Sequence, residues 1–223
     1  MTRQTVKVII VPKKEERWEG KMNHTAFLAN TRKTLSIIDE KIDGVGFEPT
    51  IKNKLSAPLF DIVHDHAKAI VILLEAPIYA SAYALVRPLI ESFVRAAWIQ
   101  HCASDDDIKD IVKKDDFPVS FGKMLNAVEE KRGWEKTLTQ LKKSAWKSMH
   151  SYTHGGMQLI SRRFKDANVE HNIDEEEIIG ILQLVNLIAF LSLNEMIGIS
   201  IGYEKEQNIL NDLCEDLCRW CFH

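Results

Sequence analysis

The chain has 223 residues, of which 45% are hydrophobic and 27% are charged, and its formal net charge is −3. These values are ordinary for a soluble globular protein, and the overall charge favours no class of partner. Four cysteines are too few for a secreted disulfide scaffold, and no secretory signal opens the chain. We therefore expect a cytoplasmic, reduced protein with a single hydrophobic core.

The N-terminal residues differ in pattern from the rest of the chain. Residues 1–12 contain the β-branched run TVKVIIVP, which stops at a proline and predicts a short extended arm. From residue 17 to residue 221 apolar residues recur at helical spacing, and Pro88 is expected to kink or restart one helix. A polar stretch with SDDD and KKDDFP separates two groups of helices. The first helix is predicted to end at residue 44, and the others to cover residues 50–76, 78–103, 120–132, 135–154, 174–203 and 205–221.

Residues 178–203 form the most apolar stretch and are numerous enough to cross a bilayer. Because Gln183, Asn186, Asn194 and Glu195 interrupt this stretch, we expect a buried central helix and no membrane partner. The stretch is apolar nearly all round, which also predicts self-association, with a dimer as the first choice. The fold class predicted for residues 1–223 is all-α, a single helical bundle with a short extended N-terminal arm.

The predicted helix 78–103 has one polar stripe. On a regular helix Arg87, Glu91, Arg95, Trp98 and His101 fall within about 120° of one another, and the apolar majority lies opposite. One interpretation is a solvated face with an Arg87–Glu91 ion pair. The other is a functional site, which Trp98 within the stripe favours, because a plain exposed face needs no tryptophan.

A second stripe is predicted around the sequence HSYTHGG. His150 and His154 lie four residues apart and point to the same side of a helix, and histidine is well suited to proton transfer near neutral pH. The stripe would extend from Trp146 to Met157 and Ser161 if the helix continued through the two glycines. The glycines either permit close backbone packing or end the helix, and a hydrogen-bonded core pair near a helix end is the alternative. We expect the histidines to lie within about 6 Å of Arg87 or Glu91, near enough for mutual electrostatic influence.

A basic segment surrounds these histidines. Residues 131–165 hold nine lysines and arginines and one acidic residue, a local charge of +8 that leaves −11 on the rest of the chain. Such a segment suits a phosphate-bearing partner, and the alternative is a solvated face that pairs with the acidic remainder. The candidate substrate-binding residues are Lys147, Arg162, Arg163, Trp98 and Tyr152.

Two further clusters match metal sites only in part. Cys214, Cys218 and Cys221 lie on one predicted helix, where three ligands seldom complete a tetrahedron, so a buried helix face explains them better than zinc. Asp61 and His64 lack the repeated carboxylate donors of bundle di-metal sites. We therefore predict no metal and no cofactor.

The sequences RPLIESFVRAAW and, some 50 residues later, HSYTHGG are similar to a bacterial family of uncharacterised helical proteins. That family resembles the HEPN domains (higher eukaryotes and prokaryotes nucleotide-binding), and the resemblance covers roughly residues 55–200. It implies a helical bundle and a metal-independent ribonuclease of toxin or phage-defence systems. Its motif is an arginine followed after four to six residues by a histidine, usually assembled across a dimer.

Arg95 and His101 match this motif by count, but Ala96 and Ala97 stand where the family commonly has a polar residue. Arg95 and His101 also lie about 120° apart on a regular helix. Arg87, Glu91 and His154 are therefore at least equal candidates.

Two functions follow as expectations. The first is a HEPN-like ribonuclease that acts on RNA or a nucleotide as a homodimer, with an antitoxin or other protein as a further partner. The second is a non-enzymatic helical binding or assembly module in which Arg87, Glu91 and the histidines form a buried network. The candidate catalytic residues are His154, His150, Arg87, Glu91, Arg95 and His101.

Overall fold

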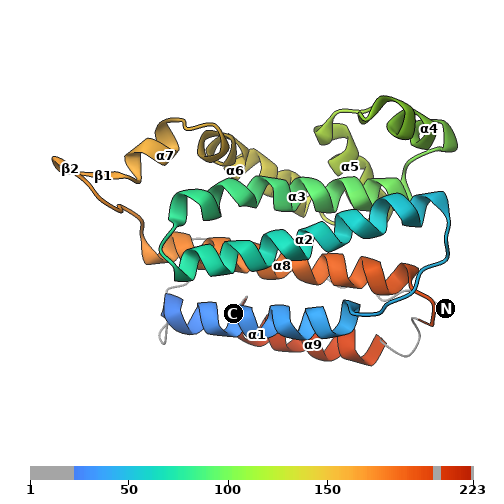
Figure 1. The fold of residues 1–223 in the computed structure, drawn as a ribbon, viewed down its shortest axis with the longest axis horizontal. Helices are drawn as coiled ribbons and strands as arrows, with labels where there is room; N and C mark the ends of the chain where they lie inside the picture. Colours follow the sequence, from blue (N-terminus) through green and yellow to red (C-terminus); the bar gives the residue numbers. More distant parts are fainter. Residues whose placement is uncertain (1–22, 203–206, 222–223) are drawn as a thin grey trace.

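The computed structural model describes residues 23–202 and 207–221, and the predicted extended arm lies outside these residues. Within them the chain forms nine helices and one two-stranded hairpin, which confirms the all-α fold (Figure 1). The helices are α1 (His24–Ile42), α2 (Ile51–Glu75), α3 (Tyr79–His101), α4 (Asp105–Lys114), α5 (Phe121–Arg132), α6 (Thr137–Thr153), α7 (Met157–Ser161), α8 (Glu175–Ile199) and α9 (Gln207–Cys221). The antiparallel hairpin pairs β1 (Phe164–Lys165) with β2 (Asn168–Val169).

The long helices are stacked in layers (Figure 1). Helix α2 packs along α3, and α8 packs against both of them. Helices α1 and α9 cover the opposite side of α8, while α5 and α6 pack on the outer side of α3. Helix α3 therefore lies between the core and the outer helices.

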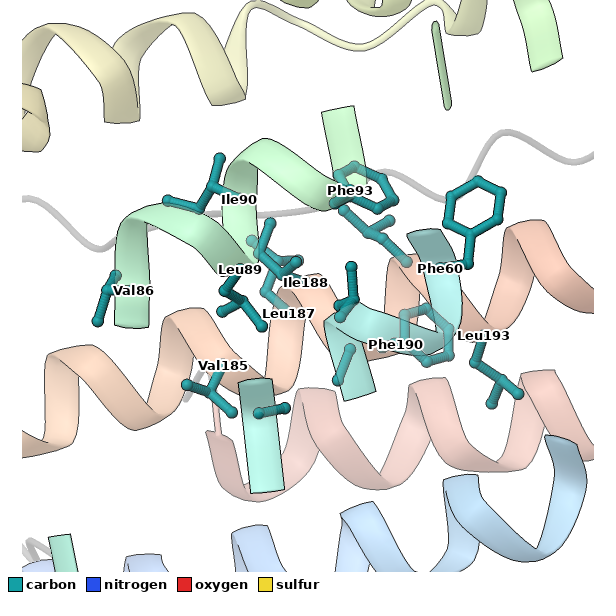
Figure 2. Packing of buried hydrophobic residues seen from close by; sticks show 14 of the residues in the cluster. Phe60, Val86, Leu89, Ile90, Phe93, Val185, Leu187, Ile188, Phe190 and Leu193 are labelled. Atoms are coloured by element: carbon teal, nitrogen blue, oxygen red, sulfur yellow. The ribbon is translucent and has the colours of Figure 1, made fainter. Parts of the chain in front are cut away.

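Buried apolar side chains from α2, α3 and α8 form the centre of the core. Figure 2 shows Phe60 of α2, Leu89 and Phe93 of α3 and Ile188 of α8 in one packed cluster. All four side chains are fully buried. Because large residues from three helices meet here, replacing one by alanine would leave a cavity costing ~2–5 kcal/mol.

Helix α8 is long and apolar enough to cross a membrane, but most of it is buried inside the bundle. Its polar residues bind neighbouring helices. The Asn186 side-chain amide donates to the Thr31 hydroxyl of α1 at 2.9 Å, and the Ser192 hydroxyl donates to the Phe60 carbonyl of α2 at 3.0 Å. Other helices cover most of α8, and self-association stays a prediction.

A charged cluster joins α8 to α3 and α5. Glu195 of α8 is only 4% exposed, yet its two carboxylate oxygens lie 2.6 Å from His101 Nε2 and 2.9 Å from Arg132 Nη2. A buried carboxylate is costly unless both oxygens find partners, and here a side chain from each neighbouring helix supplies one. This cluster fixes the relative position of three helices.

The structure differs from the sequence-based expectations at several points, and α7 and the hairpin lie where no element was predicted. Helix α4 lies in the polar stretch that was predicted to have no helix, and it begins with a capping box in which Ser104 and Asp107 bind each other's backbone amides. Helix α3 continues through Pro88, so this proline does not restart the helix, and α2 likewise continues through Pro58. Packing on the core compensates for the one backbone hydrogen bond that each proline removes.

His64 of α2 gives stability a pH dependence. Its side chain is 1% exposed, and neither ring nitrogen has a hydrogen-bond partner among the described residues. Burial, with a smaller contribution from Lys68 and against the opposing effect of Asp65, lowers the pKa of His64 from 6.5 to about 4. Between these values the unfolded chain binds the proton that the folded chain excludes, so stability falls as pH decreases from 6.5 to 4.

Replacing His64 by leucine should therefore raise the free energy of unfolding at pH 7, because it removes a buried polar group without a partner. It should also reduce the loss of stability between pH 7 and pH 4.5 by roughly 2 kcal/mol. Urea titrations at several pH values measure both effects, with the exposed His171→Leu as the control. Parallel pH profiles for wild type and His64→Leu would contradict this account.

Replacing Glu195 by glutamine should lower the free energy of unfolding by ~3–5 kcal/mol, because Arg132 and His101 lose the charge that they share. The exposed Glu215→Gln on α9 is the matched control and should change stability by less than ~0.5 kcal/mol. Urea denaturation at pH 7 compares the two variants, and equal midpoints would show that the Glu195 cluster does not hold the helices together.

Candidate functional site

Arg87 of α3 joins the two polar stripes. Its Nε donates to Glu91 Oε1 at 2.8 Å, one helical turn along α3, and its Nη1 lies 2.9 Å from His150 Nδ1 of α6. The prediction that a histidine of HSYTHGG lies within 6 Å of Arg87 is confirmed. The side chains of Arg87 and Glu91 are 24% and 18% exposed, so the cluster lies at the surface rather than in the core.

The contact with Arg87 defines the protonation state of His150. A guanidinium group donates hydrogen bonds and cannot accept them, so Nδ1 of His150 must accept from Arg87. The ring is therefore neutral while this bond exists, and its proton resides on Nε2. This leaves an N–H group on the exposed His150 ring that can donate to a bound anion.

His154 lies beside His150, with their ring centroids 4.4 Å apart, and both residues are exposed. His154 is the C-cap residue that directly follows α6, and Gly155 comes next with a left-handed φ of 68°. The glycines thus end the helix, so the stripe predicted to continue to Met157 and Ser161 is interrupted. A Cβ at Gly156 would come within 2.5 Å of the Ser151 hydroxyl, which explains why a second glycine is needed there.

Aromatic rings pack against the guanidinium group of Arg87. The guanidinium carbon of Arg87 lies 5.0 Å from the ring centroid of Trp146, and Trp146 stacks on Phe121 of α5 at 4.6 Å. Lys142 approaches both rings, at 5.7 Å from Phe121 and 6.0 Å from Trp146. Phe121 was not among the predicted site residues, because its contact depends on the packing of α5 against α6.

The other candidates on α3 lie at different distances from this cluster. Arg95 Nη2 is 3.8 Å from Glu91 Oε2, and its guanidinium lies 5.1 Å from the Phe117 ring, so Arg95 borders the cluster. His101 is bound to the buried Glu195. The structure therefore does not bring Arg95 and His101 together, and His101 belongs to the cluster that joins α3, α5 and α8.

Of the predicted substrate-binding residues, some lie near Arg87 and His150 and others do not. Lys147 is exposed and lies on the same face of α6 as His150 and His154. Trp98 and Tyr152 are 4% and 8% exposed, so neither ring is available to stack on a ligand. Trp98 packs edge-on against Phe117, which comes from the segment between α4 and α5.

Two arginines of the basic segment are bound to other residues. Arg162 Nε lies 2.5 Å from Glu177 Oε1 of α8, and its guanidinium lies over the Tyr152 ring. Arg163 contacts His171 Nδ1 at 3.0 Å on the hairpin arm. Arg162 thus holds the arm to α8, and the positive charge next to His150 comes from Arg87, Lys143 and Lys147.

No three histidine, cysteine or acidic side chains in the described ranges, 23–202 and 207–221, are arranged to hold a metal ion. Burial, assisted by the neighbouring Cys218, raises the pKa of Cys214 to about 11. Cys221 is buried in the core, and burial raises its pKa as well. These protonated thiols are poor metal ligands, and they pack as small apolar residues.

We name Arg87, Glu91, Trp146, His150 and His154 the α3–α6 site. It combines one cation, one imidazole held by that cation and one imidazole for which the structure shows no hydrogen bond to another side chain among the described residues. Arg95 and Lys147 stand at its edge. A surface of this composition can bind a phosphate group and exchange a proton with it.

Comparisons with known proteins identify the family of the chain. A family model described as "Family of unknown function (DUF6988)" matches residues 60–216, which include the whole α3–α6 site. Neither the search of curated proteins nor the search of solved structures found a match. Since the match covers well over half of its residues, the chain belongs to the family of unknown function DUF6988.

Proposed function

We propose that this protein is a metal-independent endoribonuclease and that the α3–α6 site is its active site. The observation that carries the proposal is the contact between Arg87 and His150 on an exposed surface, with His154 at ring contact. The site thus offers a cation for phosphate and an imidazole for proton transfer side by side, which is what RNA cleavage without a metal requires. The resemblance to HEPN domains points to the same chemistry.

His154 is the general base in this proposal. It takes the proton of an RNA 2′-hydroxyl, and the 2′-oxygen then attacks the adjacent phosphorus. A bond forms between phosphorus and the 2′-oxygen, the bond to the 5′-oxygen breaks, and the leaving oxygen takes a proton from water. The products are a 2′,3′-cyclic phosphate and a 5′-hydroxyl.

Arg87 and His150 act on the phosphate. The guanidinium of Arg87 stabilises the negative charge that develops on the non-bridging oxygens, and the Nε2–H of His150 donates to one of them. A neutral imidazole is too weak an acid to protonate the leaving group, which is why we assign that proton to water. Glu91 is a positioning residue, because it accepts from Arg87 Nε and fixes the plane of the guanidinium.

Positive charge around the site supports RNA binding. Lys143 and Lys147 are exposed on the face of α6 that carries both histidines, and Arg95 approaches from α3. These cations suit the phosphates on either side of the cleaved bond. A toxin or phage-defence role, a homodimer and a partner such as an antitoxin are proposals that rest on the HEPN resemblance alone.

A non-enzymatic binding module is the second candidate. The buried cluster of Glu195, His101 and Arg132 is an arginine, glutamate and histidine network of the kind that such a module would use to specify packing. The ribonuclease would cleave RNA repeatedly, whereas the binding module would not cleave it at all. An RNA that binds at the α3–α6 site and stays intact at high protein concentration would favour the module.

Replacing His154 by alanine should slow cleavage of a single-stranded RNA in EDTA by at least ~100-fold, because the general base is lost. His150→Ala should slow cleavage less, by ~10-fold, because His150 donates one hydrogen bond. Gel analysis of an end-labelled RNA gives both rates, and the exposed His171→Ala is the control. Unchanged cleavage by His154→Ala would remove His154 from the mechanism.

Lys147→Ala should weaken RNA binding equally for all sequences, since Lys147 contacts phosphate. The slope of log K against log salt should become less steep by ~0.7, the value for one contact to a single strand. Fluorescence anisotropy at several salt concentrations measures this slope in the inactive His154→Ala background. Lys113→Ala, on the distant helix α4, is the matched control, and an equal effect there would show that binding is non-specific.

A further inference from the structure

A cavity of about 400 Å³ lies between α6 and α8, on the side of α6 away from the α3–α6 site. Its volume falls within the range of small-molecule sites, ~300–1,000 Å³. Apolar side chains form most of its wall, among them Leu141 and Met149 of α6, Ile181 and Leu184 of α8, and Val86 of α3. The cavity therefore offers an apolar ligand contacts from three helices.

Helix α6 separates this cavity from the α3–α6 site. Leu141, Ala145 and Tyr152 face the cavity, whereas His150 and Lys147 lie on the opposite side of the helix. An ordinary bundle would fill the gap between α6 and α8 with large side chains. Here Ala145 of α6 and Gly180 of α8 both line it, so small residues on both walls keep the space open.

One end of the cavity is polar and carries a carboxylate that is paired with an arginine. Glu177 lines it, and both the Tyr152 hydroxyl, at 3.0 Å, and Arg162 Nε, at 2.5 Å, reach the same oxygen, Oε1. The structure shows no hydrogen bond from another described residue to Oε2 of Glu177. Tyr152 and Arg162 thus hold the carboxylate in place and leave one oxygen as an acceptor beside the apolar wall.

We propose that this cavity binds a small amphipathic molecule whose apolar body lies between α6 and α8 and whose head donates hydrogen bonds to Glu177. An amine suits this end best, because its positive charge faces a carboxylate, and a hydroxyl supplies the donor without the charge. A carboxylate head would meet Glu177 as a like charge. The site is separate from the α3–α6 site and does not depend on ribonuclease activity.

Three probes with one ten-carbon chain test the chemistry of the head. Isothermal titration of the full chain with decylamine and sodium decanoate below their micelle concentrations, and with decan-1-ol below its solubility limit, gives their dissociation constants. We expect decylamine to bind most tightly and decanoate at least tenfold more weakly. Equal binding of decylamine and decanoate, or binding of neither, would overturn the proposal.

Gly180→Leu tests the location. A Cβ at Gly180 meets no atom within 4 Å, so a side chain at this position starts in open space, and leucine should fill part of the cavity and gain helix propensity. Gly198→Leu is the matched control, since it lies on the same helix, is equally unobstructed and does not line the cavity. We expect Gly180→Leu to weaken decylamine binding at least tenfold and Gly198→Leu to leave it unchanged.

Glu177→Gln separates recognition of the head from binding of the chain. It should reduce the preference for decylamine over decanoate while the affinity for decan-1-ol stays within about twofold. Retention of decylamine binding by Gly180→Leu would place the probe elsewhere on the protein and refute the site. Because the readout is binding, these results stand whether or not the protein cleaves RNA.

Discussion

The burial of α8 is the constraint on which the rest of the structure depends. This helix is apolar on nearly every side, so it must be enclosed, and α1, α2, α3 and α9 surround it. Helix α3 faces the core on one side and keeps a polar edge on the other, where α5 and α6 pack. The contact between Arg87 and His150 follows, because both residues lie where α3 and α6 meet.

The Glu195 cluster and the α3–α6 site contain similar side chains but differ in whether a ligand can reach them. Glu195 is buried, its Oε2 contacts His101 and its Oε1 lies in ion-pair distance of Arg132, so this cluster stabilises packing and is closed off from a ligand. Arg87 is partly exposed. It contacts Glu91 and Trp146, and it is hydrogen-bonded to His150. Pre-organised charge at a surface is available to an anionic substrate, which is why we propose the second cluster as the site.

Periodicity in the sequence predicts the long helices and both polar stripes, because each depends on residues a few positions apart. It also predicts the approach of His150 to Arg87, since two polar stripes on apolar helices tend to face each other. The partners of His101 and Trp98 leave no such signal, because Glu195 and Phe117 are distant in sequence and meet them only through packing. The capping box at Ser104 is a local sequence signal for the start of α4. The polar composition of this stretch indicated a connection between helices instead.

The chemistry of the cleavage products tests the central claim most directly. An RNA incubated with the protein in EDTA should yield 2′,3′-cyclic phosphate and 5′-hydroxyl ends, identified by mass spectrometry, because the attacking group is the neighbouring 2′-hydroxyl. The same RNA with a single 2′-deoxy nucleotide at the cleavage position should stay intact at that bond. Products with 5′-phosphate ends, or cleavage at the deoxy position, would contradict the mechanism at Arg87, His150 and His154.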